Sequence, residues 1–243
     1  MERAPAINSV EACESEEMHD WNDHDASNPR PSTRPDPGFV ETARGLPPGR
    51  ALDLGCGEGA EALWLASCGW SVIAVDYAPA ALATLRRLAS ENGLEVRTVE
   101  ADLLDPDFDP RTVVDAGSPA NANAYDLVYI GYLHMEPKPR AAVLRAAERA
   151  LAAGGTILYI GITRAAGPAS KPSPNERLAT ADEIAADLAS ADVESAEVRR
   201  RLVGCPEDAF EADVLIVRAR LPSRTASASP QGTARMAPGR VGS

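Results

Sequence analysis

The sequence has few cysteines, no long apolar run and fewer basic than acidic residues. Its four cysteines, Cys13, Cys56, Cys68 and Cys205, form no closely spaced pair of the kind that binds zinc or builds a disulfide framework. No stretch approaches the ~18–20 apolar residues that a membrane helix needs. Residues 1–25 carry acids where a signal peptide needs an apolar core. We therefore expect a cytoplasmic chain without a membrane span, a zinc site or a disulfide framework.

Basic residues are outnumbered by acidic ones, 24 to 36, which gives a formal net charge of −12. A broad nucleic-acid surface requires clustered Lys and Arg side chains that bind phosphates. The charge balance therefore argues against a nucleic-acid partner.

Both ends of the 243-residue chain are poor in large apolar groups. Residues 1–28 hold eight acids and a single arginine, and residues 222–243 consist mainly of Ser, Pro, Ala and Gly with three arginines. Such segments bury too little apolar surface to offset the entropy lost on ordering. We expect one folded domain over residues 31–221, between a disordered acidic segment at 1–30 and a disordered tail at 222–243.

From residue 50 onward, short apolar runs alternate with helical patterns, which is typical of βαβ units and a mostly parallel sheet. Strands are expected at Ala51–Leu54, Ser71–Asp76, Val96–Glu100, Tyr125–Gly131, Thr156–Gly161, Val193–Val203 and Ala212–Leu221. Helices are expected at Ala60–Cys68, Pro79–Glu91 and Arg140–Ala152. A further helix begins at Thr180, where Glu183 completes a capping box. Residues 104–124 indicate a long surface loop, and the pattern leaves the strand order open.

The most informative segment is the glycine-rich turn between the first strand and the first helix, Ala51-Leu-Asp-Leu-Gly-Cys-Gly-Glu-Gly59. Glycines at 55, 57 and 59 allow a sharp turn and a close approach of a ligand to the backbone. Asp76 ends the next strand, where its carboxylate can accept both hydroxyls of a ribose. Together these features predict an adenosine-containing cofactor at this turn.

Two cofactors compete for this turn, because Gly55-x-Gly57-x-x-Ala60 also fits a relaxed nicotinamide dinucleotide pattern. Asp53, two residues before the first glycine, would repel a pyrophosphate and attract the ammonium of S-adenosylmethionine (SAM). Glu58 adds further negative charge inside the turn. Asp102, just after the third strand, supplies an acceptor for an adenine amino group. The charges therefore favour SAM over NAD.

The whole pattern resembles the class I SAM-dependent methyltransferases. Asp53–Gly59 is similar to their first motif, Val72–Asp76 to their acidic second strand, and Glu100–Asp102 to their adenine-contacting turn. Tyr125–Met135 is similar to the fourth strand with its following turn, and Ala150–Gly161 to the glycine-bounded fifth strand. Residues 57–66 resemble the small-molecule branch that includes tellurite-resistance and thiopurine methyltransferase-like enzymes.

This resemblance implies an α/β fold, doubly wound, with a mostly parallel seven-stranded sheet, helices on both faces and an antiparallel last strand. It implies SAM as the cofactor and a small molecule as the methyl acceptor. The implied cofactor-binding residues are Asp53, Gly55, Cys56, Gly57, Gly59, Asp76, Tyr77, Ala101, Asp102, Leu103 and Ile130. Relatives often carry aromatic residues before the first strand, whereas here residues 26–37 have none and only Trp21 and Phe39 flank them.

Candidates for the chemistry follow the fourth strand, namely Tyr132, His134 and Glu136. His134 has an ordinary pKa near ~6.5 that suits a general base, although a residue there can equally serve as a packed or hydrogen-bonded strand end. Tyr132 is a candidate wall of the acceptor pocket, which we expect at residues 26–39, 132–138 and 165–179. An NAD(P)-dependent oxidoreductase and a SAM-binding protein without catalysis remain alternative functions.

Other features rank lower. His19-Asp-Trp-Asn-Asp-His24-Asp25 lies in the acidic segment, and we expect no metal site there. Cys56 fits a turn that needs small residues, and Trp64 is expected in the core. The run Arg199-Arg-Arg201 interrupts a strand, and alternation sends neighbours to opposite faces, so we expect a solvated sheet edge rather than an anion site.

Overall fold

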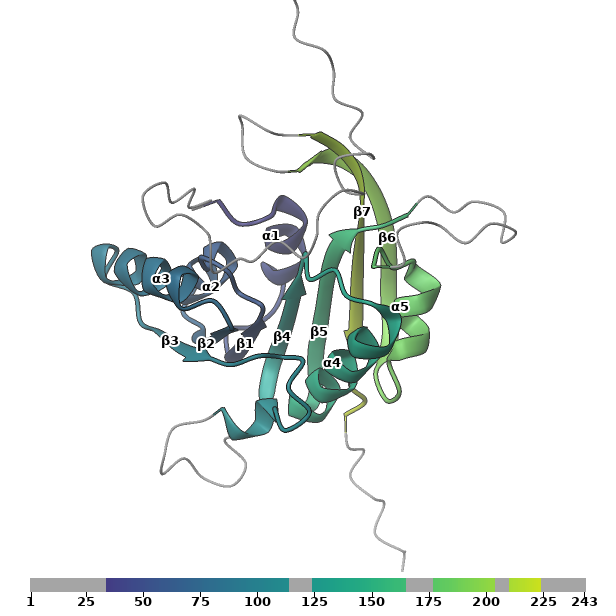
Figure 1. Cartoon of the computed structure of the whole chain (residues 1–243), viewed down its shortest axis with the longest axis horizontal. Helices are drawn as coiled ribbons and strands as arrows, with labels where there is room; N and C mark the ends of the chain where they lie inside the picture. Colours follow the sequence, from purple (N-terminus) through teal and green to yellow (C-terminus); the bar gives the residue numbers. More distant parts are fainter. Residues whose placement is uncertain (1–33, 114–123, 165–176, 204–209, 224–243) are drawn as a thin grey trace, which may run out of the picture.

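The glycine-rich turn lies near the centre of a seven-stranded sheet with the strand order β3-β2-β1-β4-β5-β7-β6 (Figure 1). This computed structural model describes residues 34–113, 124–164, 177–203 and 210–223. The strands are β1 (Arg50–Leu54), β2 (Ser71–Asp76), β3 (Val96–Glu100), β4 (Tyr125–Gly131), β5 (Leu151–Ile162), β6 (Asp192–Val203) and β7 (Phe210–Arg220). The helices are α1 (Pro37–Ala43), α2 (Ala60–Ser67), α3 (Pro79–Glu91), α4 (Pro137–Ala150), α5 (Ala181–Asp187) and the short 3-10 helix η3 (Pro110–Thr112).

The first five strands are parallel, and β7 is antiparallel to both of its neighbours, β5 and β6. The chain reverses its winding direction beside β1, which pairs with β2 on one side and β4 on the other. In open α/β sheets, ligands bind outside the carboxyl ends of the strands at such a switch point. The predicted fold class, including the antiparallel last strand, is confirmed.

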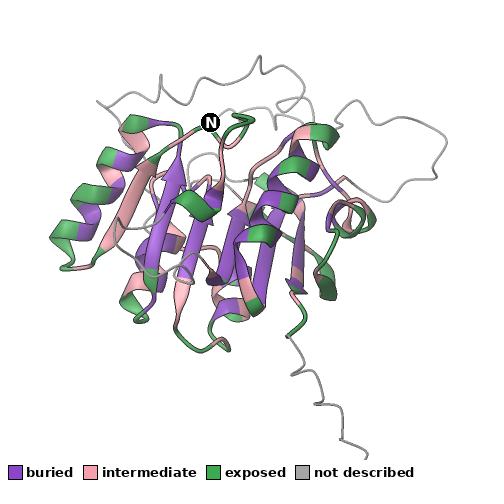
Figure 2. Cartoon of the chain, turned by 90° about the horizontal axis from the view of Figure 1, so that it is seen from below, coloured by how far each residue is buried: buried purple, intermediate pink, exposed green. Residues whose placement is uncertain are grey.

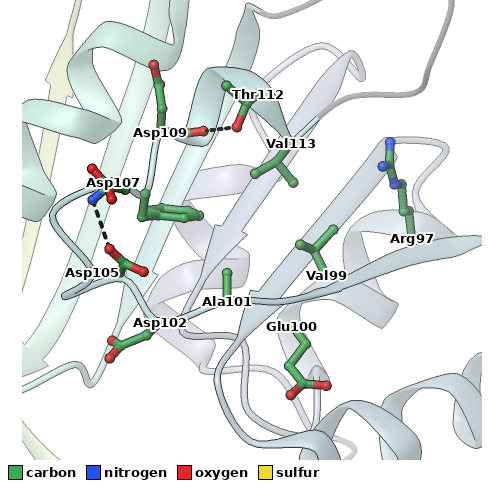
Figure 3. Close-up of a pocket in the computed structure, with 11 residues that line it drawn as sticks. Arg97, Val99, Glu100, Ala101, Asp102, Asp105, Asp107, Asp109, Thr112 and Val113 are labelled. Carbon is green, nitrogen blue, oxygen red and sulfur yellow. Dashed lines mark hydrogen bonds between the residues drawn. The ribbon is translucent and has the colours of Figure 1, made fainter.

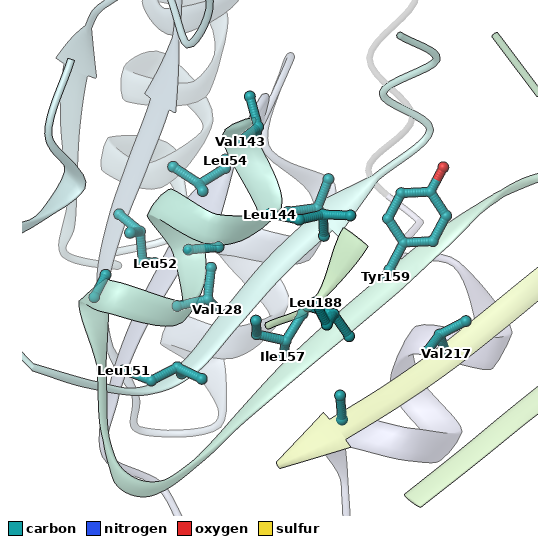
Figure 4. Close-up of a cluster of buried hydrophobic side chains, with 14 of the residues drawn as sticks. Leu52, Leu54, Val128, Val143, Leu144, Leu151, Ile157, Tyr159, Leu188 and Val217 are labelled. Atoms are coloured by element: carbon teal, nitrogen blue, oxygen red, sulfur yellow. The ribbon is translucent and has the colours of Figure 1, made fainter. Parts of the chain in front are cut away.

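Helices cover both faces of the sheet and bury its strands (Figure 2). On one face, α4 and α5 pack on a cluster that includes Leu54, Val128, Leu144 and Tyr159 (Figure 4). On the other face, apolar residues of α1, α2 and α3 pack together with β1, β2 and β4. Strands buried on both faces read as continuous apolar runs, as the sequence of β1, β2 and β4 does.

The structure corrects several element boundaries, and the largest corrections concern α4 and β5. The α4 helix begins at Pro137, three residues before the predicted start, because proline is well suited to the first helical position. β5 begins at Leu151, where a helix was expected to continue, and therefore follows α4 without a loop. β2, β3, β4 and α3 have the predicted boundaries.

The short helix α1 was not predicted. Its N-cap is Asp36, whose side chain accepts hydrogen bonds from the backbone N–H groups of Gly38 and Phe39, and Pro37 occupies the first helical position. Phe39 is fully buried and anchors α1 on the sheet, with its ring centroid 4.5 Å from that of Tyr129 and 5.5 Å from that of Trp64. An aromatic contact thus closes α1 over the sheet, although residues 26–37 lack aromatic residues. Trp64 is only partly buried.

No helix in the described ranges is long and apolar enough to cross a membrane. The cysteines described, Cys56 and Cys68, are free thiols. The predicted disordered segments 1–30 and 222–243, the His19–Asp25 run, Cys13, Trp21 and Cys205 lie outside the described residues, apart from 222 and 223.

Candidate functional site

The turn after β1 is built on three glycines in the left-handed region. Gly55, Gly57 and Gly59 have φ angles of 77°, 52° and 81°, which side chains rarely adopt. The backbone N–H groups of Gly55 and Cys56 both donate to the carbonyl of Val75, at 2.8 and 3.0 Å. These bonds hold the turn against the end of β2, beside Asp76. At the switch point of the sheet, Gly57 faces open space, whereas Gly55 and Gly59 pack against the side chains of Leu133 and Leu85.

Asp76 ends β2, and its carboxylate is almost fully buried, with 8% of the residue exposed. Its Oδ2 accepts from the backbone N–H of Gly57 at 2.8 Å, and its Oδ1 accepts from that of Ala78 at 2.9 Å. A carboxylate has about four lone-pair positions, so each oxygen retains one for a further donor. Asp76 therefore organises the glycine turn and still offers acceptors to a ribose.

Asp53 faces the α1–α2 side of β1 and is 1% exposed, and neither of its carboxylate oxygens has a hydrogen-bond partner within the described residues. Burial raises the pKa of Asp53 well above its usual range, and the nearby carboxylates of Glu61 and Asp76 raise it further. A buried polar group without a partner is costly, so such a group marks a place where a ligand or water completes the structure. A cationic ligand group would satisfy Asp53 best.

Tyr129 is the direct partner of Asp53 across β1 and β4, so the two side chains share one face of the sheet. Its hydroxyl is also buried without a hydrogen-bond partner in the described ranges. Burial raises the pKa of Tyr129 well above its usual value, and the charges of Glu61 and Asp53 add to this effect. A neutral phenol donor and a carboxyl group therefore lie side by side, unbonded, beneath the glycine turn.

A hollow of about 440 Å³ lies beyond the end of β3 (Figure 3). Its apolar part is formed by Val99, Ala101, Phe108 and Val113. Polar and mostly acidic side chains line the rest, namely Arg97, Glu100, Asp102, Asp105, Asp107, Asp109 and Thr112. Asp102 is exposed, and its Oδ1 accepts from the backbone N–H of Leu104 at 2.8 Å.

The remaining predicted cofactor residues lie around the same edge of the sheet. Leu103 is partly buried against the apolar cluster, Ile130 is fully buried at the end of β4, and Tyr77 is 41% exposed just after Asp76. Cys56 is buried within the glycine turn, and burial raises the pKa of its thiol well above the usual range. A thiol held in its neutral form suits a small packing residue better than a nucleophile.

Tyr132 follows β4 with a φ angle of 52°, an unusual conformation for a residue with a side chain. Its backbone N–H donates to the carbonyl of Ile160 at 2.7 Å, and its hydroxyl donates to Oδ2 of Asp36 at 2.6 Å. Burial raises the pKa of Tyr132, and the hydrogen bond to Asp36 raises it further. The strained backbone thus aims a neutral phenol at the start of α1.

His134 contacts the end of β5, because its Nε2 accepts a hydrogen bond of 3.1 Å from the backbone N–H of Ile162. Burial lowers the pKa of His134 to about 4, so the ring is neutral at physiological pH. Its ring and that of Tyr132 meet edge to face, with centroids 6.4 Å apart. The accepting nitrogen is therefore occupied by backbone, and a catalytic role of His134 stays a prediction. Glu136, the third candidate, is exposed and pairs with Arg177 at 3.1 Å.

Three residues at this site were not predicted. Asp36 accepts hydrogen bonds from Tyr132 and from Nη1 of Arg201, the latter at 2.9 Å, while its own backbone N–H donates to Oε1 of Glu61 at 2.9 Å. Asp36 therefore connects the start of α1 to β4, β6 and α2. The Asp-Pro pair is a helix-start signal that could have revealed Asp36. Nothing in the sequence near Glu61 or Arg201 indicates that the three meet.

The predicted solvated edge at residues 199–201 is correct in part. β6 is the edge strand, and Arg199 and Arg200 form exposed ion pairs with Glu197 and Glu211, respectively. The prediction is wrong for Arg201, whose side chain is 18% exposed and turned toward α1 and Asp36. The alternation of the strand separates Arg200 from its two neighbours.

Known proteins resemble the part of the chain that contains the glycine turn, Asp76 and Tyr132. The profile of a family described as "Methyltransferase domain" matches residues 51–155. Demethylmenaquinone methyltransferase of Thermus thermophilus is 34% identical over 123 residues, which cover 50% of this chain and 50% of that protein. Ribosomal RNA small subunit methyltransferase C of Alcanivorax borkumensis is 39% identical over 59 residues, 24% of this chain and 18% of that protein. The chain thus spans half or less of the length of these curated relatives.

Solved structures share the fold over most of the chain. One of them was solved in work on the conversion of a disulfide bond into a thioacetal group during echinomycin biosynthesis. It has a TM-score of 0.62 at 23% identity, and the match covers 80% of this chain and 84% of that one. TehB from Haemophilus influenzae has a TM-score of 0.60 at 16% identity, covering 75% and 61%. The N-methyltransferase NodS from Bradyrhizobium japonicum WM9, solved with S-adenosylhomocysteine, has a TM-score of 0.55 at 18% identity, covering 76% and 84%.

Proposed function

We propose that this chain is a class I SAM-dependent methyltransferase that transfers a methyl group from SAM to a small-molecule acceptor, and the match of residues 51–155 to the methyltransferase domain profile supports this. The observation that carries the proposal is the buried carboxyl of Asp53, just before the glycine turn, which has no hydrogen-bond partner among the described residues. A SAM ammonium group supplies the cation that this carboxyl lacks. A small acceptor is supported by the resemblance of residues 57–66 to the small-molecule branch and by the similarity to demethylmenaquinone methyltransferase, which is named for a small-molecule substrate.

Most parts of SAM have a candidate partner among the described residues. Asp53 would hold the ammonium, and the glycine turn, which is open at Gly57, would lie against the methionine portion. Asp76 would accept the ribose hydroxyls with its two remaining lone-pair positions. The apolar side of the hollow beyond β3 would receive the adenine ring, with Asp102 as acceptor for its amino group.

SAM supplies a methyl group already activated on a sulfonium, so the protein contributes mainly alignment and exclusion of water. Tyr132, which is held by hydrogen bonds to Asp36 and to the Ile160 carbonyl, would form one wall of the acceptor site. A soft nucleophile such as a thiol needs no strong base, whereas an oxygen or amine acceptor benefits from one. His134, neutral and buried beside Tyr132, is the residue nearest to that role.

The nicotinamide alternative is disfavoured by two observations. Dinucleotide-binding sheets of the doubly wound type have the strand order 3-2-1-4-5-6, whereas here an antiparallel β7 lies between β5 and β6. Asp53 and Glu61 flank the turn that a pyrophosphate would occupy. A phosphate there would disfavour the ionised form of the buried Asp53 carboxyl further, whereas the ammonium of SAM would stabilise it. A cytoplasmic location is part of the proposal and depends on the scattered cysteines.

Isothermal titration with SAM and with NAD tests the cofactor, and binding of NAD without binding of SAM contradicts the proposal. Turnover is tested by release of S-adenosylhomocysteine in the presence of thiol, amine, phenol and metalloid acceptors. If SAM binds and no acceptor in a broad panel is methylated, the alternative of a SAM-binding protein without catalysis is favoured.

A further inference from the structure

Arg201 holds α1 with only part of its guanidinium group. Nη1 donates to Oδ1 of Asp36 at 2.9 Å. Nε and Nη2 are shielded from solvent and have no hydrogen-bond partner in the part of the chain that the structure describes. An arginine buried in this way leaves two donors unsatisfied, which costs free energy unless an acceptor arrives.

The two unsatisfied donors form one edge of the guanidinium, the edge whose parallel N–H groups match the two oxygens of a carboxylate. Other arginines of this chain fill that edge with a carboxylate. Nε and Nη2 of Arg199 both donate to Oε2 of Glu197, at 3.0 and 2.7 Å. Nε and Nη2 of Arg111 both donate to Oδ2 of Asp109, at 3.0 and 2.6 Å. Of these three arginines, only Arg201 has no acceptor on this edge among the described residues.

Arg201 is connected to the proposed reaction site through Asp36. Asp36 accepts from Arg201 through one oxygen and from the hydroxyl of Tyr132 through the other, so the arginine and the proposed acceptor wall share one carboxylate. Gly38 permits this approach, because a Cβ there would come within 3.0 Å of Nη1 of Arg201. The backbone N–H of Asp36 is bonded to Glu61 in the first turn of α2, directly after the glycine turn.

We propose that the unsatisfied Nε and Nη2 donors of Arg201 bind a carboxylate of one of the two reactants, and this inference rests on the proposed methyltransferase function. The carboxylate has two available sources. SAM carries one on its methionine portion, and the acceptor carries one if it is an organic acid. In either case Arg201 is a binding residue, and Asp36 positions it through Nη1.

The competing explanation is that Arg201 only fastens α1 to β6. Arg199 provides a matched control for this explanation. It lies two residues away on the same side of β6 and pairs with Glu41 of α1, but its Nε–Nη2 edge is already filled by Glu197. If fastening α1 is what matters, Arg199→Leu and Arg201→Leu will have similar effects. If a carboxylate binds, only the Arg201 variant will lose a ligand.

The test compares the wild-type protein, Arg201→Leu, Arg201→Lys and Arg199→Leu by isothermal titration. The first ligands are S-adenosylhomocysteine, which has the amino-acid carboxylate, and 5′-methylthioadenosine, which lacks it. If SAM is the source, Arg201→Leu weakens S-adenosylhomocysteine at least tenfold and leaves methylthioadenosine unchanged. Arg201→Lys keeps the charge without the two-donor edge, so it shows a smaller loss in the same direction, and it serves if the leucine variant does not fold.

The second ligands are benzoate and benzamide, titrated into the protein with and without S-adenosylhomocysteine. If the acceptor is the source, benzoate binds the wild type and Arg199→Leu saturably, benzamide does not, and Arg201→Leu loses benzoate binding. The inference is overturned if Arg201→Leu binds both S-adenosylhomocysteine and benzoate as the wild type does. It is also overturned if Arg199→Leu loses ligand binding to the same extent as Arg201→Leu. A wild type that binds no S-adenosylhomocysteine contradicts the proposed function instead, and the benzoate titration of the free protein then decides the inference.

Discussion

Asp53 and Tyr129 are direct partners across β1 and β4, and neither side chain has a hydrogen-bond partner in the described ranges. We expect Asp53→Asn to weaken SAM binding by about 1.5–3 kcal/mol, the usual magnitude for a hydrogen bond to a charged group. Because burial raises the pKa of Asp53, its carboxyl takes up a proton in the free protein more readily than an exposed aspartate does. Binding an ammonium group favours the ionised form, so SAM binding should release protons from the wild type.

Titration calorimetry in two buffers of different ionisation enthalpy measures this proton release, which Asp53→Asn should abolish. The affinity of the wild type for SAM should rise with pH up to the raised pKa and then level off. Equal apparent enthalpies in the two buffers for the wild type would contradict the role of Asp53 as the ammonium partner.

The same pKa shift predicts how stability varies with pH. Between the unfolded pKa of an aspartate, about 3.9, and the raised pKa of Asp53, the folded protein binds more protons than the unfolded chain. The contribution of Asp53 to stability is therefore present at low pH and is lost as pH rises through the folded pKa. Urea unfolding without cofactor should show that the free energy of unfolding falls less between pH 4 and pH 8 for Asp53→Asn than for the wild type.

Asp76 has two functions that different substitutions can separate. Asp76→Ala should weaken SAM binding by ~1.5–3 kcal/mol, because it removes the ribose acceptors. It also frees the N–H groups of Gly57 and Ala78, so the glycine turn should loosen. Asp76→Asn keeps a single oxygen acceptor, so its melting temperature should be higher than that of Asp76→Ala. Unchanged SAM affinity in Asp76→Ala would show that the ribose is held elsewhere.

His134 should stabilise the fold above pH 6.5 and lose this contribution as pH falls. Burial lowers its pKa to about 4, so the unfolded chain binds the proton more strongly than the folded protein between pH 4 and pH 6.5. His134→Ala leaves the N–H of Ile162 without its acceptor and should cost about 1–3 kcal/mol at pH 7. His134→Gln offers an alternative acceptor and serves as the control. Urea unfolding at pH 7 and pH 5 measures both effects.

The catalytic hypothesis for His134 is tested separately by its pH profile. If His134 is the general base, the rate of S-adenosylhomocysteine release should fall as pH decreases through about 4, and both variants should be slow. If His134 only supports the end of β5, His134→Gln should keep a rate near that of the wild type.

The fold could be predicted because its local signals agree with its global arrangement. β2, β4 and α3 have their predicted boundaries, since apolar runs, Pro79 and the Asn92-Gly93 stop mark their ends. The strand order could not be predicted, because alternation of strands and helices does not determine which strands become neighbours. The antiparallel last strand came from the family resemblance. The seven-residue helix α1 was missed because its one buried aromatic, Phe39, gives no periodic pattern.

The site could be predicted only where its residues lie close together in the sequence. The glycine turn and Asp76 are close in sequence to the strands that place them, so spacing sufficed to locate them. Asp36 and Arg201 are 165 positions apart, and their ion pair depends on a hairpin of β6 and β7 that extends over α1. Strand alternation indicated that the side chains of Arg200 and Arg201 lie on opposite faces of β6. Only the tertiary structure shows that the face with Arg201 is the one turned toward α1.

Tyr132→Phe tests whether the Tyr132 hydroxyl has more than a structural function. The substitution removes the 2.6 Å hydrogen bond to Asp36 and should destabilise the packing of α1 by about 1.5–3 kcal/mol, as expected for a bond to a carboxylate. Amide exchange in Phe39–Ala43 should therefore accelerate at least tenfold, with little change in the central strands. Because burial and Asp36 raise the pKa of Tyr132, its phenol stays neutral and cannot serve as a base at physiological pH.

We accordingly expect Tyr132→Phe to keep kcat within a fewfold of the wild type, since the ring still forms the wall. Tyr132→Ala removes the ring and should lower kcat/KM by at least tenfold through misalignment of the acceptor. Measuring S-adenosylhomocysteine release for both variants separates the two contributions. A Phe variant as inactive as the Ala variant would mean that the hydroxyl takes part in the reaction itself. Asp36 would then hold a reacting group in place in addition to fastening α1.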